Sequence, residues 1–148
     1  MTHTTRTNIL KYASLGLIGF GVLNFLSLFP FLQPVMGWFL DLAYLSPFGT
    51  DHQLASPAGA LWIAISGGLL AGWGTTLWLI SSQVYSKDPS LGSRIILTGV
   101  AVWFVIDSAG SIAVGAPFNA VLNFAFLLMF EIPLLWPKGK PTTSTLAA

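Results

Sequence analysis

Four long apolar runs, separated by polar stretches, set the hydrophobic pattern of this chain. The first two runs contain no charged residue, the third contains only Asp107 and the fourth only Glu131. A membrane-spanning helix needs about 20 mostly apolar residues, and each run is close to that length. The sequence therefore predicts an all-α fold, a bundle of four transmembrane helices. The predicted spans are 12–32, 58–80, 95–116 and 118–136.

The connections between the runs differ in length and character. The first connection is long, and its segment 34–45 is apolar but too short to cross a membrane. It carries Trp38 and Tyr44, aromatic residues of the kind that prefer the membrane–water interface. We therefore expect a short interfacial segment there. Residues 1–137 are predicted to form one membrane domain, and 138–148, rich in Thr, Ser and Lys, a disordered cytoplasmic tail.

All six basic residues lie outside the four runs and on one side of the predicted membrane. Four crossings bring the N-terminus, the middle connection and the C-terminal tail to the same side. The positive-inside rule identifies that side as the cytoplasm. The sequence thus predicts cytoplasmic N- and C-termini in a plasma membrane. The six residues are Arg6, Lys11, Lys87, Arg94, Lys138 and Lys140.

Composition supports a membrane protein and excludes several partners. Apolar residues make up 54% of the 148 residues and charged residues 7%, against roughly 25% charged in soluble domains. A net charge of +1 with no basic stripe argues against a nucleic-acid partner. The chain has no cysteine, which excludes disulfides and thiolate metal sites. We expect the lipid bilayer as a partner, with a second copy of the chain or a larger membrane complex as further candidates, and no cofactor or metal.

Small residues recur every four positions in the second run. Such a ridge lets two helix backbones approach closely, and close packing drives association in lipid, where the hydrophobic effect contributes little. The ridge has two interpretations: packing against another helix of the same bundle, or an interface between copies of the chain. Its predicted members are Ala64, Gly68, Gly72 and Thr76, continuing from Ala60.

Each run also carries polar residues at a similar predicted depth. Counted at 1.5 Å per residue from the outer ends, three of them lie roughly 12 Å deep and Asn123 roughly 8 Å deep. Polar groups in hydrocarbon avoid lipid and bind one another. We therefore expect one polar core, or ligand-binding site, where the four helices meet. Its predicted members are Asn24, Ser66, Asp107, Ser111, Asn119 and Asn123.

Asp107 is the most informative single residue of this group. An Asp at the membrane centre costs about 2.5–3.5 kcal/mol on insertion scales, and no Lys or Arg lies in any run to pair with it. We expect a protonated carboxyl that is held by Asn and Ser hydrogen bonds. It then serves either as a structural clasp between helices or as a site for a ligand or a proton.

The other polar residues have simpler interpretations. Glu131 lies about one turn from Trp136, where it can extend toward Lys138 or lipid head groups. His3 and His52 are predicted outside the hydrocarbon on opposite sides, so they cannot together ligate a haem. No nucleophile–base pair or metal set is visible, so no catalytic residue is predicted.

Several four-helix membrane families are excluded by missing residues. Disulfide-forming quinone enzymes need cysteine pairs, b-type cytochrome anchors need intramembrane histidines, and retinal proteins need an intramembrane lysine. Small multidrug exporters need a Glu in the first span, and the MAPEG enzymes need a charged motif in the second. None of these residues is present.

One resemblance remains. The stretch 103–108, followed by Ser111, Gly115, Asn119, Asn123 and 133–135, together with 71–74, resembles small bacterial four-helix membrane proteins of unassigned function. It implies a bacterial inner-membrane protein and carries no activity.

Three functions stay open on the sequence. The first is a non-enzymatic membrane protein, an accessory subunit or a binder of a lipid-like or small polar ligand around Asp107. The second is a small oligomeric transporter or proton-coupled permease that uses Asp107. The third, a lipid-modifying enzyme, lacks any visible catalytic group.

Overall fold

The computed structural model describes residues 1–45 and 56–136, and these residues form helices and no strands. Four helices are long and apolar enough to cross a membrane, which confirms the predicted all-α class. The elements are α1 (His3–Leu26), α2 (Gln33–Ala43), α3 (Pro57–Leu79), the π-helical η1 (Ile80–Tyr85) that continues α3, α4 (Pro89–Ala113) and α5 (Pro117–Leu135).

Side-chain caps, more than hydropathy, mark where α1 and α4 begin. The Thr2 side chain accepts a hydrogen bond from the Thr5 N–H at 3.1 Å, so α1 begins nine residues before the predicted apolar run. Asp88 caps α4 in the same way, because its carboxylate accepts from the N–H groups of Ser90 and Leu91 at 3.0 Å each. The predicted spans therefore located all four helices and came within one residue of the start of α3 and of both ends of α5, but they misplaced the starts of α1 and α4.

The end of α1 differs most from the prediction. The helix stops at Leu26, whereas the apolar run continues to 32. At its end the Ser27 hydroxyl donates to the Asn24 carbonyl oxygen at 2.6 Å, and the chain then turns toward α2. The hydropathy pattern does not reveal this turn, because the residues after it are still apolar.

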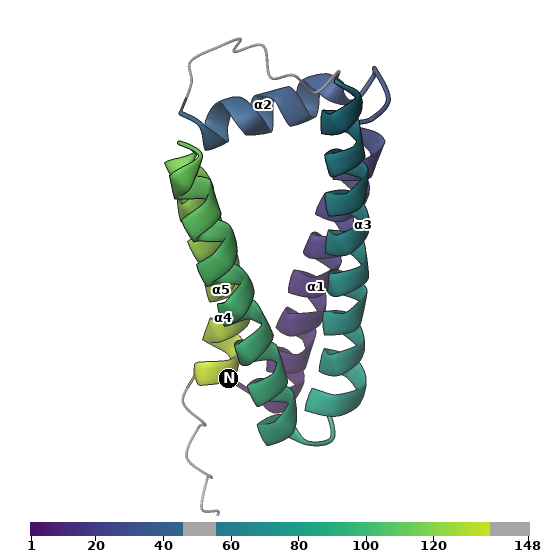
Figure 1. The fold of residues 1–148 in the computed structure, drawn as a ribbon. Helices are drawn as coiled ribbons and strands as arrows, with labels where there is room; N and C mark the ends of the chain where they lie inside the picture. Colours follow the sequence, from purple (N-terminus) through teal and green to yellow (C-terminus); the bar gives the residue numbers. More distant parts are fainter. Residues whose placement is uncertain (46–55, 137–148) are drawn as a thin grey trace, which may run out of the picture.

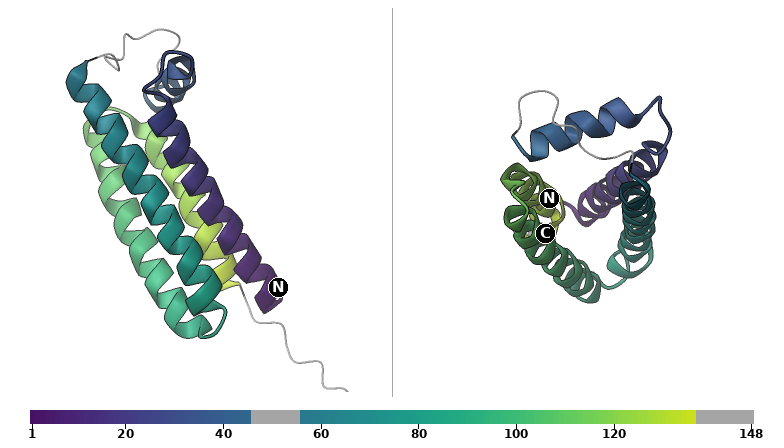
Figure 2. Two further views of the ribbon diagram at one scale, coloured as in Figure 1. Left: turned by 90° about the vertical axis from the view of Figure 1, so that its right-hand side faces the viewer. Right: turned by 45° about the horizontal axis from the view of Figure 1, so that its top comes forward.

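The helices form two pairs, α1 with α3 and α4 with α5, as Figure 1 and Figure 2 show. The pairs approach each other at the end that holds the N-terminus, here called the terminal end. They diverge toward the opposite end, where α2 lies across the bundle. The predicted short interfacial segment is thus a helix that does not cross with the others, and we call its side of the molecule the α2 end.

Glycines bring α1 and α3 into close contact. A Cβ added to Gly67 would lie 2.9 Å from both the Gly21 carbonyl oxygen and the Phe25 nitrogen. One added to Gly74 would lie 2.9 Å from the Ile18 nitrogen. Real side chains essentially never approach backbone atoms so closely, so these positions require glycine.

The predicted small-residue ridge is therefore not the face of α3 that packs within the bundle. Gly68 and Gly72 are exposed, and a Cβ added to either meets no atom within 4 Å. Thr76 is also exposed, and Ala64 is partly buried. The period of four marks a helix face correctly, but the face that packs on α1 is rotated by one residue.

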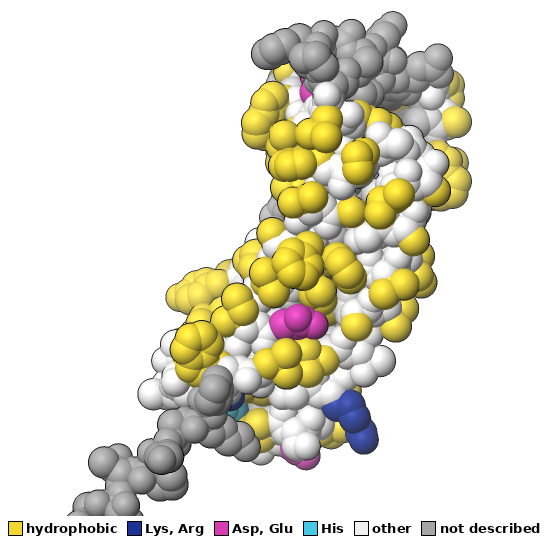
Figure 3. Space-filling model, turned by 90° about the vertical axis from the view of Figure 1, so that its left-hand side faces the viewer, with side chains coloured by type: hydrophobic (Ala, Val, Ile, Leu, Met, Phe, Trp, Pro, Cys, Tyr) yellow, Lys and Arg dark blue, Asp and Glu magenta, His cyan; other side chains and the backbone are white. Residues whose placement is uncertain are grey.

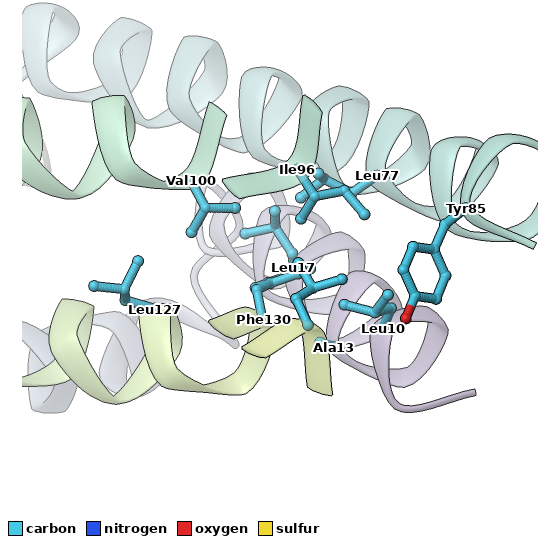
Figure 4. Packing of buried hydrophobic residues seen from close by; sticks show 10 residues of the cluster. Leu10, Ala13, Leu17, Leu77, Tyr85, Ile96, Val100, Leu127 and Phe130 are labelled. Atoms are coloured by element: carbon cyan, nitrogen blue, oxygen red, sulfur yellow. The ribbon is translucent and has the colours of Figure 1, made fainter. Parts of the chain in front are cut away.

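The two pairs are joined by an apolar cluster near the terminal end. Figure 4 shows Leu10, Leu77, Ile96 and Phe130 pointing into the space between the helices. Each of these four is at most 2% exposed. The full cluster is Leu10, Ala13, Leu17, Leu77, Tyr85, Ile96, Val100, Leu127, Phe130 and Leu134.

The terminal end also collects the described basic residues. His3 Nε2 lies 3.2 Å from the Ser86 carbonyl oxygen, which ties the N-terminus to the connection between η1 and α4. Figure 3 shows Lys and Arg only toward this end of the face, below a broad hydrophobic surface. The predicted grouping of Arg6, Lys11, Lys87 and Arg94 on one side therefore agrees with the fold. Lys138, Lys140 and the predicted tail lie outside the described residues.

Candidate functional site

A hydrogen-bonded polar cluster joins α4 to α5, and Asp107 lies at its centre. Its Oδ2 atom accepts a hydrogen bond from Asn119 Nδ2 at 3.2 Å and another from Asn123 Nδ2. Asn119 Nδ2 also donates to Ser111 Oγ at 2.8 Å, and Asn123 Nδ2 to Ser108 Oγ at 3.3 Å. Four of the six predicted polar residues, Asp107, Ser111, Asn119 and Asn123, are thus brought together.

The donor and the acceptor of each of these hydrogen bonds can be assigned from the chemistry of the groups involved. The Ser111 hydroxyl donates its only proton to the Asp107 backbone oxygen at 2.7 Å, so its oxygen can only accept from Asn119. The Asp107 Oδ2 atom likewise accepts, because both of its partners are amide nitrogens. Each amide nitrogen carries two hydrogens, and each of the two Asn nitrogens makes two hydrogen bonds within the cluster.

The remaining predicted residues, Asn24 and Ser66, form a separate pair between α1 and α3. Asn24 Nδ2 donates to Ser66 Oγ at 2.7 Å, and that hydroxyl donates to the Ile63 carbonyl oxygen at 3.1 Å. The expectation of one polar core shared by four helices is therefore corrected to two groups, one in each helix pair. The helices diverge at this level, so polar groups of opposite pairs find partners within their own pair.

A mostly apolar cavity of about 320 Å³ lies between the two pairs. Its walls come from α1, α3, α4 and α5, and Phe39 of α2 contributes to its rim. The polar side chains that line it are Asn119 and Asn123, while Asp107 is not part of its lining. Its apolar lining is Gly16, Leu17, Phe20, Phe39, Leu70, Trp103, Leu122, Phe126 and Met129. Its volume falls in the usual range for small-molecule sites.

A second cavity, also of about 320 Å³, lies under α2 between α1 and α3. Asn24 and Ser66 supply its polar groups, and Met36, Leu40 and Trp62 are among its apolar residues. Phe20 and Phe39 line both cavities, with ring centroids 5.2 Å apart. The two cavities therefore adjoin at one aromatic pair.

The sequence missed two parts of this site. Ser108 is buried and binds Asn123; its position next to Asp107 was the available signal. An aromatic row also crosses three helices, because Trp103 of α4 contacts both Trp73 and Phe126, with centroids 5.5 Å and 5.3 Å away. No spacing within one helix reveals contacts between three.

Other predicted residues lie away from the cavities. Glu131 is partly buried on α5 and borders a shallow pocket with Leu135 and Trp136 toward the terminal end. His3 lies at the terminal end against Tyr85, and His52 is outside the described residues. Within 1–45 and 56–136, no three acidic or histidine side chains gather as metal ligands would.

No protein-family model, curated protein or solved structure matches this chain. The two cavities and the polar groups that line them are therefore the features of the chain that bear on its function.

Proposed function

We propose that this chain is a non-enzymatic integral membrane protein that binds a lipid-like molecule in the cavity between its two helix pairs. The observation that carries the proposal is the lining of that cavity. Aromatic and aliphatic side chains form most of the wall, and two asparagines form its only polar patch. Small-molecule sites are commonly apolar cavities with a few placed polar groups.

The fixed geometry of the polar patch supports a binding role. Asn119 and Asn123 are held by Asp107, Ser108 and Ser111, so their amides are oriented before any ligand arrives. A preoriented site loses less side-chain entropy on binding. Asp107 acts here as a positioning residue, because it fixes the amides and does not itself line the cavity.

Binding can be tested with a brominated long-chain alcohol, because bromine quenches tryptophan fluorescence on contact. The full chain has six tryptophans. A variant that keeps only Trp103, which lines the cavity, should show saturable quenching in lipid nanodiscs. A variant that keeps only Trp136, which is 51% exposed at the end of α5, should show only the gradual quenching of a lipid-facing residue.

Two glycines of α1 provide a matched pair for this test. Gly16 lines the cavity and Gly19 does not, and an added Cβ meets nothing within 4 Å at either position. Gly16→Phe should fill the cavity and weaken saturable quenching at least about tenfold, equivalent to about 1.4 kcal/mol, whereas Gly19→Phe should leave it unchanged. Equal quenching in both variants would refute binding in this cavity.

The shape of the bundle supports a second candidate, a proton-coupled transporter. The apolar cluster separates the cavity from the terminal end. A transporter alternates between access from one side and access from the other, and this arrangement corresponds to the state that is closed on the terminal side. Asp107 Oδ1 accepts no hydrogen bond from the described residues, and that oxygen would carry the proton. This function would require an oligomer or a second state with access to the terminal end.

We also propose that the terminal end faces the cytoplasm, in a bacterial inner membrane. The support is the grouping of basic residues at that end. The chain has no native cysteine, so single cysteines can be introduced at Asp51 and Ser86. In intact cells an impermeant thiol reagent should label Asp51→Cys, and should label Ser86→Cys only after permeabilisation. The opposite labelling pattern would show that the terminal end faces away from the cytoplasm.

A further inference from the structure

The polar patch of the cavity offers hydrogen-bond acceptors and no free donors. Both amide nitrogens are fully used, because Asn119 and Asn123 each give their two N–H groups to Asp107 and a serine. The carbonyl oxygens Oδ1 of the same residues accept no hydrogen bond within the described part of the chain. Each of the two asparagines therefore has only a hydrogen-bond acceptor left for a ligand.

These oxygens are not sealed in the protein. Asn119 is partly buried and Asn123 is only 6% exposed, yet no fully buried side-chain oxygen in the described residues lacks a partner. Each unpartnered carbonyl oxygen must therefore retain accessible surface. Both residues line the cavity, and we take the accessible surface of these acceptors to lie there.

The second cavity resembles the first in part, because its asparagine also keeps an acceptor oxygen, although only one of its two N–H groups is used. Asn24 gives an N–H to Ser66, whose own proton goes to the Ile63 carbonyl oxygen. Asn24 is 8% exposed, its Oδ1 accepts no hydrogen bond from the described residues, and it lines that cavity. Three asparagines on two helices, α1 and α5, thus give N–H groups to the neighbouring helix of their own pair and keep carbonyl oxygens without a partner among the described residues.

We infer that the ligand of the first cavity is an amphiphile whose head group donates a hydrogen bond, a hydroxyl or an amine, to Asn119 and Asn123. The inference rests on the proposed binding function and adds the chemistry of the head group. A carbonyl oxygen in an apolar cavity gains most from an N–H or O–H donor. A head group that only accepts, such as an ether or a carboxylate, would place oxygen against oxygen and lose its hydration.

The test compares four probes that share one dibrominated C18 chain and differ only in the head group. They are the alcohol, the amine, the methyl ether and the carboxylic acid at pH 8. With the Trp103-only protein in nanodiscs, the alcohol and the amine should bind about tenfold more tightly than the ether and the acid, as expected for one or two hydrogen bonds. If the amine binds more tightly than the alcohol, the natural head group is cationic. If the amine and the alcohol bind equally, the natural head group is neutral.

The outcomes separate this inference from the proposed function. If the ether and the acid bind as tightly as the alcohol, the donor requirement is wrong while binding in the cavity stands. If no probe gives saturable quenching, the proposed function itself fails.

Two asparagine variants locate the head group. Asn119→Leu should reduce the tenfold preference for alcohol over ether, whereas Asn24→Leu should leave it unchanged. The reverse result would place the head group in the second cavity and overturn the assignment to Asn119 and Asn123. The ratio measured in the Trp103-only protein needs neither asparagine substitution, so the inference stays testable if either substitution prevents folding.

Discussion

Gly67→Leu should destabilise the bundle by about 1–3 kcal/mol or more, whereas Gly68→Leu should change its stability little. At Gly67 even the first side-chain carbon would lie 2.9 Å from backbone atoms of α1, so the helices must separate. Overpacking of a close contact typically costs about 1–3 kcal/mol. At Gly68 the added side chain meets no atom of this chain within 4 Å of its Cβ. Leucine also forms helix more readily than glycine, by up to about 1 kcal/mol.

The two variants form a matched experiment, because they place the same side chain at neighbouring positions of α3. Unfolding in detergent, followed by circular dichroism, measures the difference in stability. If Gly68→Leu were the more damaging variant, the close contact of α1 and α3 described here would be wrong. If Gly68→Leu left stability intact but dissociated an oligomer, the ridge at Gly68 and Gly72 would serve the predicted interface between copies of the chain.

Asp107→Leu should destabilise the contact of α4 with α5, and Asp107→Asn should be tolerated. The Asp107 Oδ2 atom accepts hydrogen bonds from Asn119 and Asn123, and leucine removes this acceptor, which leaves each amide nitrogen with only its serine partner. Polar contacts between membrane helices are worth about 0.6 kcal/mol each and up to about 1.7, so we expect a loss of about 1–3 kcal/mol. Asparagine keeps a carbonyl oxygen at the same position and loses only the ability to ionise.

The asparagine variant also separates the two proposed functions. A ligand binder with Asp107→Asn should fold and bind the brominated alcohol like the parent protein. A proton-coupled transporter should fold but lose proton flux in liposomes, because asparagine cannot take up and release a proton. An asparagine variant as unstable as the leucine variant would show that the fold requires the ionised carboxylate, against our expectation of a protonated one.

The number and type of helices could be predicted from the sequence because lipid imposes one simple rule. A spanning segment must be long, apolar and helical, and four runs satisfy that rule. Helix ends depend on local hydrogen bonds instead. Thr2 extends α1 far before its apolar run, and the turn at Ser27 ends it before that run is over. Neither effect changes the average hydropathy.

The candidate site was predicted in part for a related reason. Asp107, Ser111, Asn119 and Asn123 lie on two helices joined by a tight turn, so their depths could be compared reliably. Asn24 lies two residues from the end of α1 rather than deep within it, so the count from a misplaced helix end assigned it to the wrong group. The choice between Gly67 and Gly68 depends on helix rotation, which periodicity alone does not fix when α3 is apolar on every side.

The position of α2 has a consequence for the width of the cavity. It follows directly after α1 and contacts α5, so it bridges the two pairs where they are furthest apart. A helix of 11 residues is about 16 Å long and nearly incompressible along its axis. Because α2 lies between the ends of the two pairs, it limits how closely they can approach at this level. A segment too short to cross the membrane thus sets how far apart the crossing helices stand.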